Sequence, residues 1–216
     1  MARILSLITM VALCCSFTAC GFLPFGGGAS AYKPTEVMDS AFMGDLADAK
    51  PGKSVTYVTT PGDMKVTVKV VGKDGDALLV EHWTEMPSMS YGLLYKVGSD
   101  KKVKEAYAAA KDDKEWTKIA VKDTPKPQGG GDAPKPEIKE SDEKKEVKAG
   151  NFSSRRIDVK GSNYSSTAWY SKDVPKLYMF SPEHGGAVAM EGAGSKTSLE
   201  AKADDAKASA LEMPKK

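Results

Sequence analysis

Two histidines, His82 and His184, are the residues of this 216-residue chain best suited to acid–base chemistry. Nucleophilic catalysis needs a base beside the nucleophile. His82 lies in an alternating stretch that predicts a strand, so the neighbouring Glu81 points to the opposite face and cannot pair with it. His184 follows Glu183 in a turn, where it could contact a metal or a phosphate. Two histidines without a partner cysteine make a poor structural zinc site, so the sequence predicts no catalytic residue and no metal site.

Carboxylates and glycines give no stronger indication of an enzyme. Glu81 and Glu85 share a strand face on either side of Trp83, but their Cα atoms would be about 13 Å apart at ~3.3 Å per residue. Glycoside hydrolases place their carboxyl groups about 5 to 9.5 Å apart. The glycine triplets at 26–28 and 129–131 lack the Gly-Lys-Ser or Gly-Lys-Thr of a phosphate-binding loop. The chain is therefore predicted to be non-enzymatic and to need no cofactor.

Cys20 has the most informative surroundings of any residue in the chain. Arg3 is followed by an apolar run at 4–13, and Phe17-Thr18-Ala19 leads into Cys20. This arrangement resembles the lipobox signal of bacterial lipoproteins, with Phe17 where that signal usually has Leu. The apolar run is too short for a membrane-spanning helix, which needs about 20 residues. The resemblance implies a signal peptide at 1–19 and lipidation of Cys20. An ordinary secretory peptide, cleaved after Ala19 or further on, is the alternative.

Removal of residues 1–19 would also remove Cys14 and Cys15 and leave Cys20 as the first residue. No intramolecular disulfide could then form. Several acyl chains on one cysteine anchor a protein firmly, whereas a single chain holds it only marginally. In enterobacterial lipoproteins, an Asp directly after the lipidated cysteine resembles a mark for retention in the inner membrane. This chain has Gly21 at that position, which favours the outer membrane. The prediction is a protein of the cell envelope that is lipid-anchored at the outer membrane.

Charge is nearly balanced, with 31 Lys and Arg against 29 Asp and Glu. A balanced chain lacks the basic footprint of a nucleic-acid-binding protein, so we expect no nucleic-acid partner. The lysines are interleaved with acids, which is typical of a solvated surface. Residues 20–34 contain Gly26-Gly27-Gly28 and few polar groups, and they are predicted to form a flexible tether.

Alternating apolar and polar residues predict a series of short strands between turns. The clearest is at 64–70, where Met64, Val66, Val68 and Val70 alternate with polar residues. Turn signals about every 8 to 12 residues favour an antiparallel sheet over a βαβ fold. The alanines at 102–110 are also compatible with a helix, although we favour a strand there. The other predicted strands are at 54–60, 77–85, 89–97, 115–121, 152–159, 165–170, 177–180, 187–191 and 195–201.

Three segments depart from this alternation. Residues 35–50 place apolar side chains at helical spacing after Thr35, a suitable N-cap, and predict a short helix. Residues 122–148 are rich in Pro, Gly, Lys and Glu and contain no aromatic residue, which predicts a disordered insertion in one sheet, or a linker between two domains. The tail at 204–216 is rich in alanine and lysine, and a helix is the most structure that it is predicted to form. The predicted fold is mainly β (α+β): one domain at 35–203, with a curved antiparallel sheet or half-barrel and a short covering helix.

Two parts of the chain resemble a group of bacterial envelope proteins. Residues 51–57, 70–72 and 81–85 form one part, and residues 167–175 with 185–188 form the other. Together they are similar to the half-barrels of LolA, LolB and mycobacterial LppX. The resemblance implies a curved antiparallel sheet that is closed on one side by helices and holds acyl chains in its hollow. Its most specific stretch, Trp169-Tyr170-Ser171-Lys172-Asp173-Val174-Pro175, is a fold marker and carries over no ligand-binding residue.

Apolar side chains could line such a hollow. Methionine is flexible and often lines adaptable binding surfaces. The same residues would equally fill an ordinary hydrophobic core, and the sequence leaves both alternatives open. If the sheet curves and residues 35–50 cover it, the lining consists of Phe42, Met64, Met89, Tyr91, Leu93 and Tyr95.

These observations predict a membrane-anchored, non-enzymatic lipoprotein that binds a hydrophobic ligand such as a lipid or an acyl chain. The anchor makes it resemble a LolB-like receptor more than a soluble shuttle. The alternative is a structural or surface-exposed interaction lipoprotein with protein partners and no small ligand. A cavity under the helix would favour the first hypothesis, and a filled core would favour the second.

Overall fold

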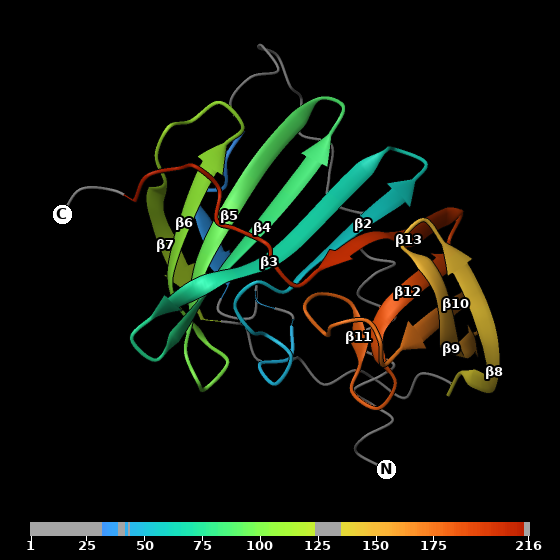
Figure 1. Cartoon of the computed structure of the whole chain (residues 1–216). Coiled ribbons are helices and arrows are strands. Elements are labelled where there is room, and N and C mark those ends of the chain that lie inside the picture. Colours follow the sequence, from blue (N-terminus) through green and yellow to red (C-terminus); the bar gives the residue numbers. More distant parts are fainter. Residues whose placement is uncertain (1–31, 39–41, 43, 124–134, 214–216) are drawn as a thin grey trace.

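The computed structural model of the chain describes residues 32–38, 42, 44–123 and 135–213. The predicted signal peptide, Cys20 and most of the tether lie outside these residues. The described residues form thirteen strands and no helix, and hence no helix that could cross a membrane (Figure 1). The strands are β1 (Glu36–Met38), β2 (Ser54–Thr60), β3 (Met64–Asp74), β4 (Ala77–Met86), β5 (Met89–Val97), β6 (Val103–Ala110), β7 (Thr117–Lys122), β8 (Glu137–Val147), β9 (Gly150–Lys160), β10 (Ser165–Ser171), β11 (Phe180–Ser181), β12 (Gly185–Gly192) and β13 (Ser195–Ala203).

All these strands belong to one mixed sheet that does not close into a barrel. Its order is β1-β7-β6-β5-β4-β3-β2-β13-β12-β10-β9-β8, and the short β11 pairs with β12. β1 and β7 are parallel, whereas the other neighbours are antiparallel. Figure 1 shows the sheet strongly bent, so that β8, β9 and β10 stand at an angle to β3, β4 and β5. The prediction of a mainly β fold is confirmed.

The short covering helix predicted at 35–50 is wrong for the residues described there. Residues 36–38 form β1, which pairs with β7, and residues 46–48 form a turn. Gly44 and the aspartates of this segment are poor helix formers. The backbone N–H of Asp45 donates to the carbonyl of Lys176 (2.6 Å), and its carboxylate accepts from Lys176 Nζ (2.8 Å). Partners in other parts of the chain therefore override the helical spacing.

The disordered insertion predicted at 122–148 is wrong for residues 137–147, which form β8; residues 124–134 lie outside the described residues. β8 pairs with β9 along its whole length. Its acids find a partner across this pair, because Arg155 donates to Glu140 (2.9 Å) and to Asp142 (3.1 Å). A strand at the edge of a sheet needs only one neighbour, and charges on it discourage pairing with another chain.

The remaining predicted strands are confirmed within a few residues, with one exception. The pattern at 177–180 predicts a strand, but only Phe180–Ser181 pairs, as β11. Leu177 lies in a loop, and its side chain is nevertheless buried, with 1% of it exposed. The apolar pattern at 177–180 therefore reflects burial of a loop and not strand pairing. Residues 102–110 are a strand and not a helix. The alanines of β6 are buried beside β5, where small side chains fit.

One face of the sheet, called the inner face below, carries the main hydrophobic core. It bears Val66, Thr84 and Tyr91, which lie opposite one another on β3, β4 and β5. Its buried apolar residues form a single cluster that extends from Val103 on β6 to Ile157 on β9. Loops, not helices, cover this face among the described residues. The loop residues that join the cluster are Phe42, Ala49, Val174 and Leu177.

A close backbone contact holds one of these loops against the sheet. Gly185 has a φ of 97°, and a Cβ atom at this position would lie 2.1 Å from the carbonyl oxygen of Ser171. The neighbouring Gly186 donates its N–H to the carbonyl of Val174 (2.9 Å). Only glycine combines this backbone conformation with so close an approach. The Trp-Tyr-Ser-Lys-Asp-Val-Pro stretch and the later glycine pair therefore form one interlocked turn.

The C-terminal tail crosses the opposite, outer face of the sheet (Figure 1). It is extended, so the prediction of a tail that is helical at best is wrong for residues 204–213. Its backbone bonds to other segments instead: Ala206 N–H donates to Gly52 (2.8 Å), and Trp116 N–H donates to Glu212 (2.9 Å). With Leu211 the tail covers a second apolar cluster, which contains Leu94, Tyr107, Ala109, Trp116 and, half-buried, Trp83.

A buried carboxylate fixes the tail to the sheet. Glu81, on the outer face of β4, is 1% exposed. One of its oxygens lies 2.7 Å from Lys69 Nζ and accepts from Trp83 Nε1 (3.2 Å). The other accepts from the N–H (2.9 Å) and the hydroxyl (3.1 Å) of Ser209 in the tail. A buried charge is tolerated when its hydrogen-bonding capacity is satisfied, and here the tail supplies half of the partners.

Replacing Glu81 should therefore destabilise the whole domain. In Glu81→Ala, the half-buried groups of Lys69, Trp83 and Ser209 lose their buried acceptor, which we expect to lower the free energy of unfolding by about 3 to 5 kcal/mol. Urea denaturation followed by circular dichroism measures this loss. Glu85→Ala is the matched control on the same face of β4. Its pair with Lys65 (3.7 Å) is exposed, so we expect a loss below about 1 kcal/mol. Equal losses in the two variants would contradict the role given to Glu81.

Candidate functional site

The inner face is arranged in rows, because residues paired across neighbouring strands lie side by side on one face. The row at the hairpin turns contains Met64, Met86 and Met89: Met86 pairs with Met89, and Met64 lies one residue beyond the Lys65–Glu85 pair. The next row contains Tyr57, Val66, Thr84, Tyr91 and Ala110. Further in lie Val55, Val68, His82, Leu93 and Ala108, followed by Val70, Val80, Tyr95 and Ala106.

Residues predicted to line a hollow fall into two groups on this face. Phe42, Leu93 and Tyr95 are buried in the core. Met64 and Tyr91 are half-buried and pack against the core, and Met89 is half-buried at the end of the sheet. The centre of the inner face is therefore a filled core, whereas the end beside the hairpin turns presents accessible apolar surface. We call this accessible end the rim; it consists of Tyr32, Met64, Met86, Met89 and Tyr91.

Three further side chains, those of Tyr32, His82 and Tyr178, lie on this surface or beside it. The ring of Tyr32, which is 48% exposed, meets that of Tyr91 edge-on at 5.5 Å. The ring of Tyr178 meets that of His82 in the same manner at 5.2 Å. Met86, the hairpin partner of Met89, also lies on this face. Tyr32 and Tyr178 come from outside the strands of this face, so no periodic pattern indicates their place.

The side chains of these rows are uncharged at neutral pH. Burial lowers the pKa of His82 to about 4, so its imidazole is neutral at pH 7. Burial also raises the pKa of Tyr91 and of Tyr95, so both phenols keep their protons. Glu81 lies on the outer face, as the alternation predicts, and forms no dyad with His82. A neutral surface of aromatic, aliphatic and thioether groups suits an apolar ligand better than proton transfer.

His184 lies elsewhere, in an open hollow beside β8 and β9. Its Nε2 is 3.9 Å from the carboxylate of Glu140, which also accepts from Arg155. The hollow has a volume of about 590 Å³, and its lining mixes acids with cations. Across the ranges that the structure describes, no three His, Cys, Asp or Glu side chains are grouped so that they could hold a metal ion.

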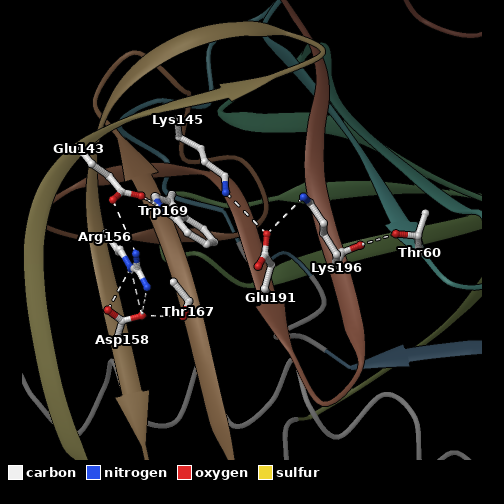
Figure 2. Close-up of polar contacts among 9 residues, drawn as sticks. All are labelled: Thr60, Glu143, Lys145, Arg156, Asp158, Thr167, Trp169, Glu191 and Lys196. Carbon is white, nitrogen blue, oxygen red and sulfur yellow. Dashed lines mark hydrogen bonds and ion pairs between the residues drawn. The ribbon is translucent and has the colours of Figure 1, made fainter.

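A polar network covers Trp169 on the outer face (Figure 2). Trp169 is 5% exposed; Lys145 Nζ lies 3.4 Å from its ring centroid, and the guanidinium of Arg156 lies at 5.5 Å. The indole N–H donates to Glu143, and Arg156 is also paired with Asp158 (3.0 Å). These cation–π contacts and ion pairs link β8, β9 and β10. Because its ring is covered, Trp169 contributes to packing of the sheet and offers no stacking surface to a ligand.

Comparisons with known proteins add little to this picture. No protein-family model matches the chain, and no curated protein sequence matches it. One solved structure, described as "Structure of PNGF-II in P21 space group", aligns with 77% of this chain and 32% of that chain, at 11% identity and a TM-score of 0.33. The alignment thus spans about a third of that protein's length. A likeness this weak carries no argument about fold or function.

Replacing His82 should change how stability depends on pH. Its pKa is about 4 in the folded protein and about 6.5 when unfolded, so the unfolded chain takes up the proton first as the pH falls. Between pH 6.5 and 4 the native chain should therefore lose up to about 3 kcal/mol more stability than His82→Phe, which keeps a ring against Tyr178. Urea unfolding at pH 7, 5.5 and 4.5 measures the difference. Parallel pH profiles for the two proteins would contradict the neutral, buried imidazole.

Proposed function

We propose that this chain is a lipid-anchored, non-enzymatic lipoprotein of the outer membrane, and that the rim of its inner face binds an acyl chain. The observation that carries the proposal is the accessible, uncharged rim at one end of an open sheet. Ligand sites for apolar molecules are concave and lined mainly by apolar and aromatic groups. The rim supplies both kinds of side chain, and its three methionines can adapt to a flexible ligand.

The energetics of burial set the size of the ligand. Each buried methylene contributes about 0.8 kcal/mol. A micromolar dissociation constant corresponds to about 8 kcal/mol, so burial of roughly ten methylenes would be sufficient before the cost of ordering the chain. The exposed ring of Tyr32 and the half-buried rim residues can cover part of a chain of that length, whereas the filled core beneath them cannot admit it. We therefore propose surface binding at the rim and not an enclosed cavity.

Resemblance to the LolA, LolB and LppX half-barrels also supports an acyl-chain ligand. Those proteins combine a curved sheet with covering helices. Here the sheet is open and bent, but loop residues such as Phe42 and Leu177 take the place of the helices among the described residues. The proposal therefore keeps the ligand class that the resemblance implies and moves the site from a central hollow to the end of the sheet.

A structural or interaction lipoprotein without a small ligand is the second candidate. The observation that favours it is the filled centre of the inner face, where Leu93 and Tyr95 are buried in the core. On this hypothesis, protein partners would bind elsewhere on the surface. The two candidates differ in whether the isolated protein takes up a fatty acid.

Binding of a fluorescent fatty acid tests the proposal. The full chain with Cys14→Ser, Cys15→Ser and Cys20→Ser has no acyl chain of its own to compete. We expect this protein to bind a dansyl-labelled fatty acid with a blue shift in emission. Tyr91→Glu should weaken binding by about tenfold or more, because a charge in an apolar site costs several kcal/mol.

The matched control is Thr67→Glu, which adds the same charge to the outer face of β3. It should bind the fatty acid as the parent does. Urea unfolding should show that both variants remain folded. Failure of the parent to bind, or equal weakening in the two variants, would exclude the rim as the site and favour the structural or interaction lipoprotein.

Cys20 should decide where the protein resides. In a bacterial host, the native chain should incorporate labelled palmitate and sediment with the outer membrane. Cys20→Ser should lose the label and most of the membrane association, because the acyl chains provide the anchor. Cys15→Ser is the control within the predicted signal peptide and should retain both. Labelling that persists in Cys20→Ser would contradict the lipobox interpretation.

A further inference from the structure

Three methionines stand in line across three neighbouring strands at the rim. Met86 of β4 pairs directly with Met89 of β5 across the hairpin turn. The register of β3 with β4 pairs Lys65 with Glu85, which places Met64 opposite Met86. The register of β4 with its two neighbours is unbroken over this end of the sheet. The three residues are therefore adjacent in space, although Met64 is more than 20 positions from the other two along the chain.

Alternation along each strand puts the three side chains on the same face. They share parity with Val66, Thr84 and Tyr91, which belong to the inner face. Neighbouring strands are about 4.8 Å apart, so Met86 is within side-chain reach of both flanking methionines. The thioethers can converge above Met86 because methionine has three rotatable side-chain bonds and little rotamer preference to overcome.

The surroundings favour a soft ligand for these sulfur atoms. All three methionines are half-buried, so an ion can reach them from solvent while the sheet shields one side. The nearest charged neighbours along the strands, Lys65 and Glu85, point to the outer face and pair with each other at 3.7 Å. Thioether sulfur is a soft donor without charge; it selects Cu(I) and offers little to Zn(II), Mg(II) or Ca(II).

We propose that Met64, Met86 and Met89 form a three-thioether site for a soft monovalent metal ion, Cu(I). The site requires no oxidation or reduction of the protein, because the ion binds and leaves in one oxidation state. The proposal does not rest on acyl-chain binding, although both would use the methionines of the rim; replacing methionine by leucine removes the sulfur and nearly conserves the apolar volume.

Silver(I) is the redox-inert probe for this site. The full chain with its three cysteines replaced by serine, as above, is labelled with ¹³C at the methionine methyl groups and titrated with Ag(I). We expect one equivalent to bind and to shift the methyl resonances of Met64, Met86 and Met89 together. Competition with a chromogenic Cu(I) chelator under reducing, anaerobic conditions then gives the affinity for Cu(I).

Met86→Leu should weaken Cu(I) binding by about 100-fold or more. Removing a residue that only hydrogen-bonds to a metal ligand lowers metal affinity by about 10- to 100-fold, and removing a ligand itself should cost at least as much. Met190→Leu is the matched control: Met190 is a half-buried methionine on β12, where it pairs with Thr197 of β13, and it should leave the affinity unchanged. The Ag(I) titration and the Cu(I) competition are carried out without fatty acid, so their outcome does not depend on the function proposed above. The site is refuted if Ag(I) shifts none of the three methyl resonances, or if Met86→Leu and Met190→Leu bind Cu(I) equally.

Discussion

An open sheet that has no helix packed on it must bury its apolar face by bending and by folding its own loops inward. This constraint governs the described part of the molecule. Residues from β6 at one end to β9 at the other share one core, because the bend of the sheet brings these strands together. The two loops that complete the core are tied to each other, since Asp45 and Asp48 both bond to Lys176. The Lys176 ammonium lowers the pKa of Asp45, so this tie is ionic at neutral pH.

The two faces of the sheet differ in how they accommodate charged side chains. On β3, β4 and β5 the rows of the inner face carry no charge, and His82 there is neutral because desolvation disfavours the imidazolium. The outer face carries charges, but the most deeply buried of them, on Glu81, is matched by Lys69, Trp83 and the C-terminal tail. At the other end of the outer face, Trp169 is enclosed by Lys145 and Arg156. Charged side chains thus shield aromatic rings on the outer face, and apolar side chains do so on the inner one.

Function is confined by this arrangement to the places that packing leaves accessible. The centre of the inner face is filled, and half-buried apolar side chains remain at the rim, where the strands end in hairpin turns and where we propose that a ligand binds. The rim offers two kinds of chemistry in adjacent rows. Tyr91 and Tyr32 present aromatic surface, while the methionine row outside them presents sulfur. The two proposed ligands, an acyl chain and a soft metal ion, would therefore share the methionines, and the tyrosines would contact the acyl chain alone.

The sequence by itself determined the strands, because alternation with a period of two is a local property that burial of one face imposes on each strand. It also placed Glu81 and His82 on opposite faces and put Met64, Met89, Tyr91, Leu93 and Tyr95 on one face. Only the structure decided that residues 36–38 and 137–147 are strands. Residues 36–38 pair with β7, which is distant in the chain and cannot be inferred from their helical spacing. Residues 137–147 pair with β9 across a short turn, and their charged, non-alternating composition does not indicate this pairing. The structure likewise decided which apolar residues are core and which form the rim. Burial depends on how far each row lies from the covering loops, and that distance is set by the bend of the whole sheet and by the close contact at Gly185, not by any residue's own neighbours in the chain.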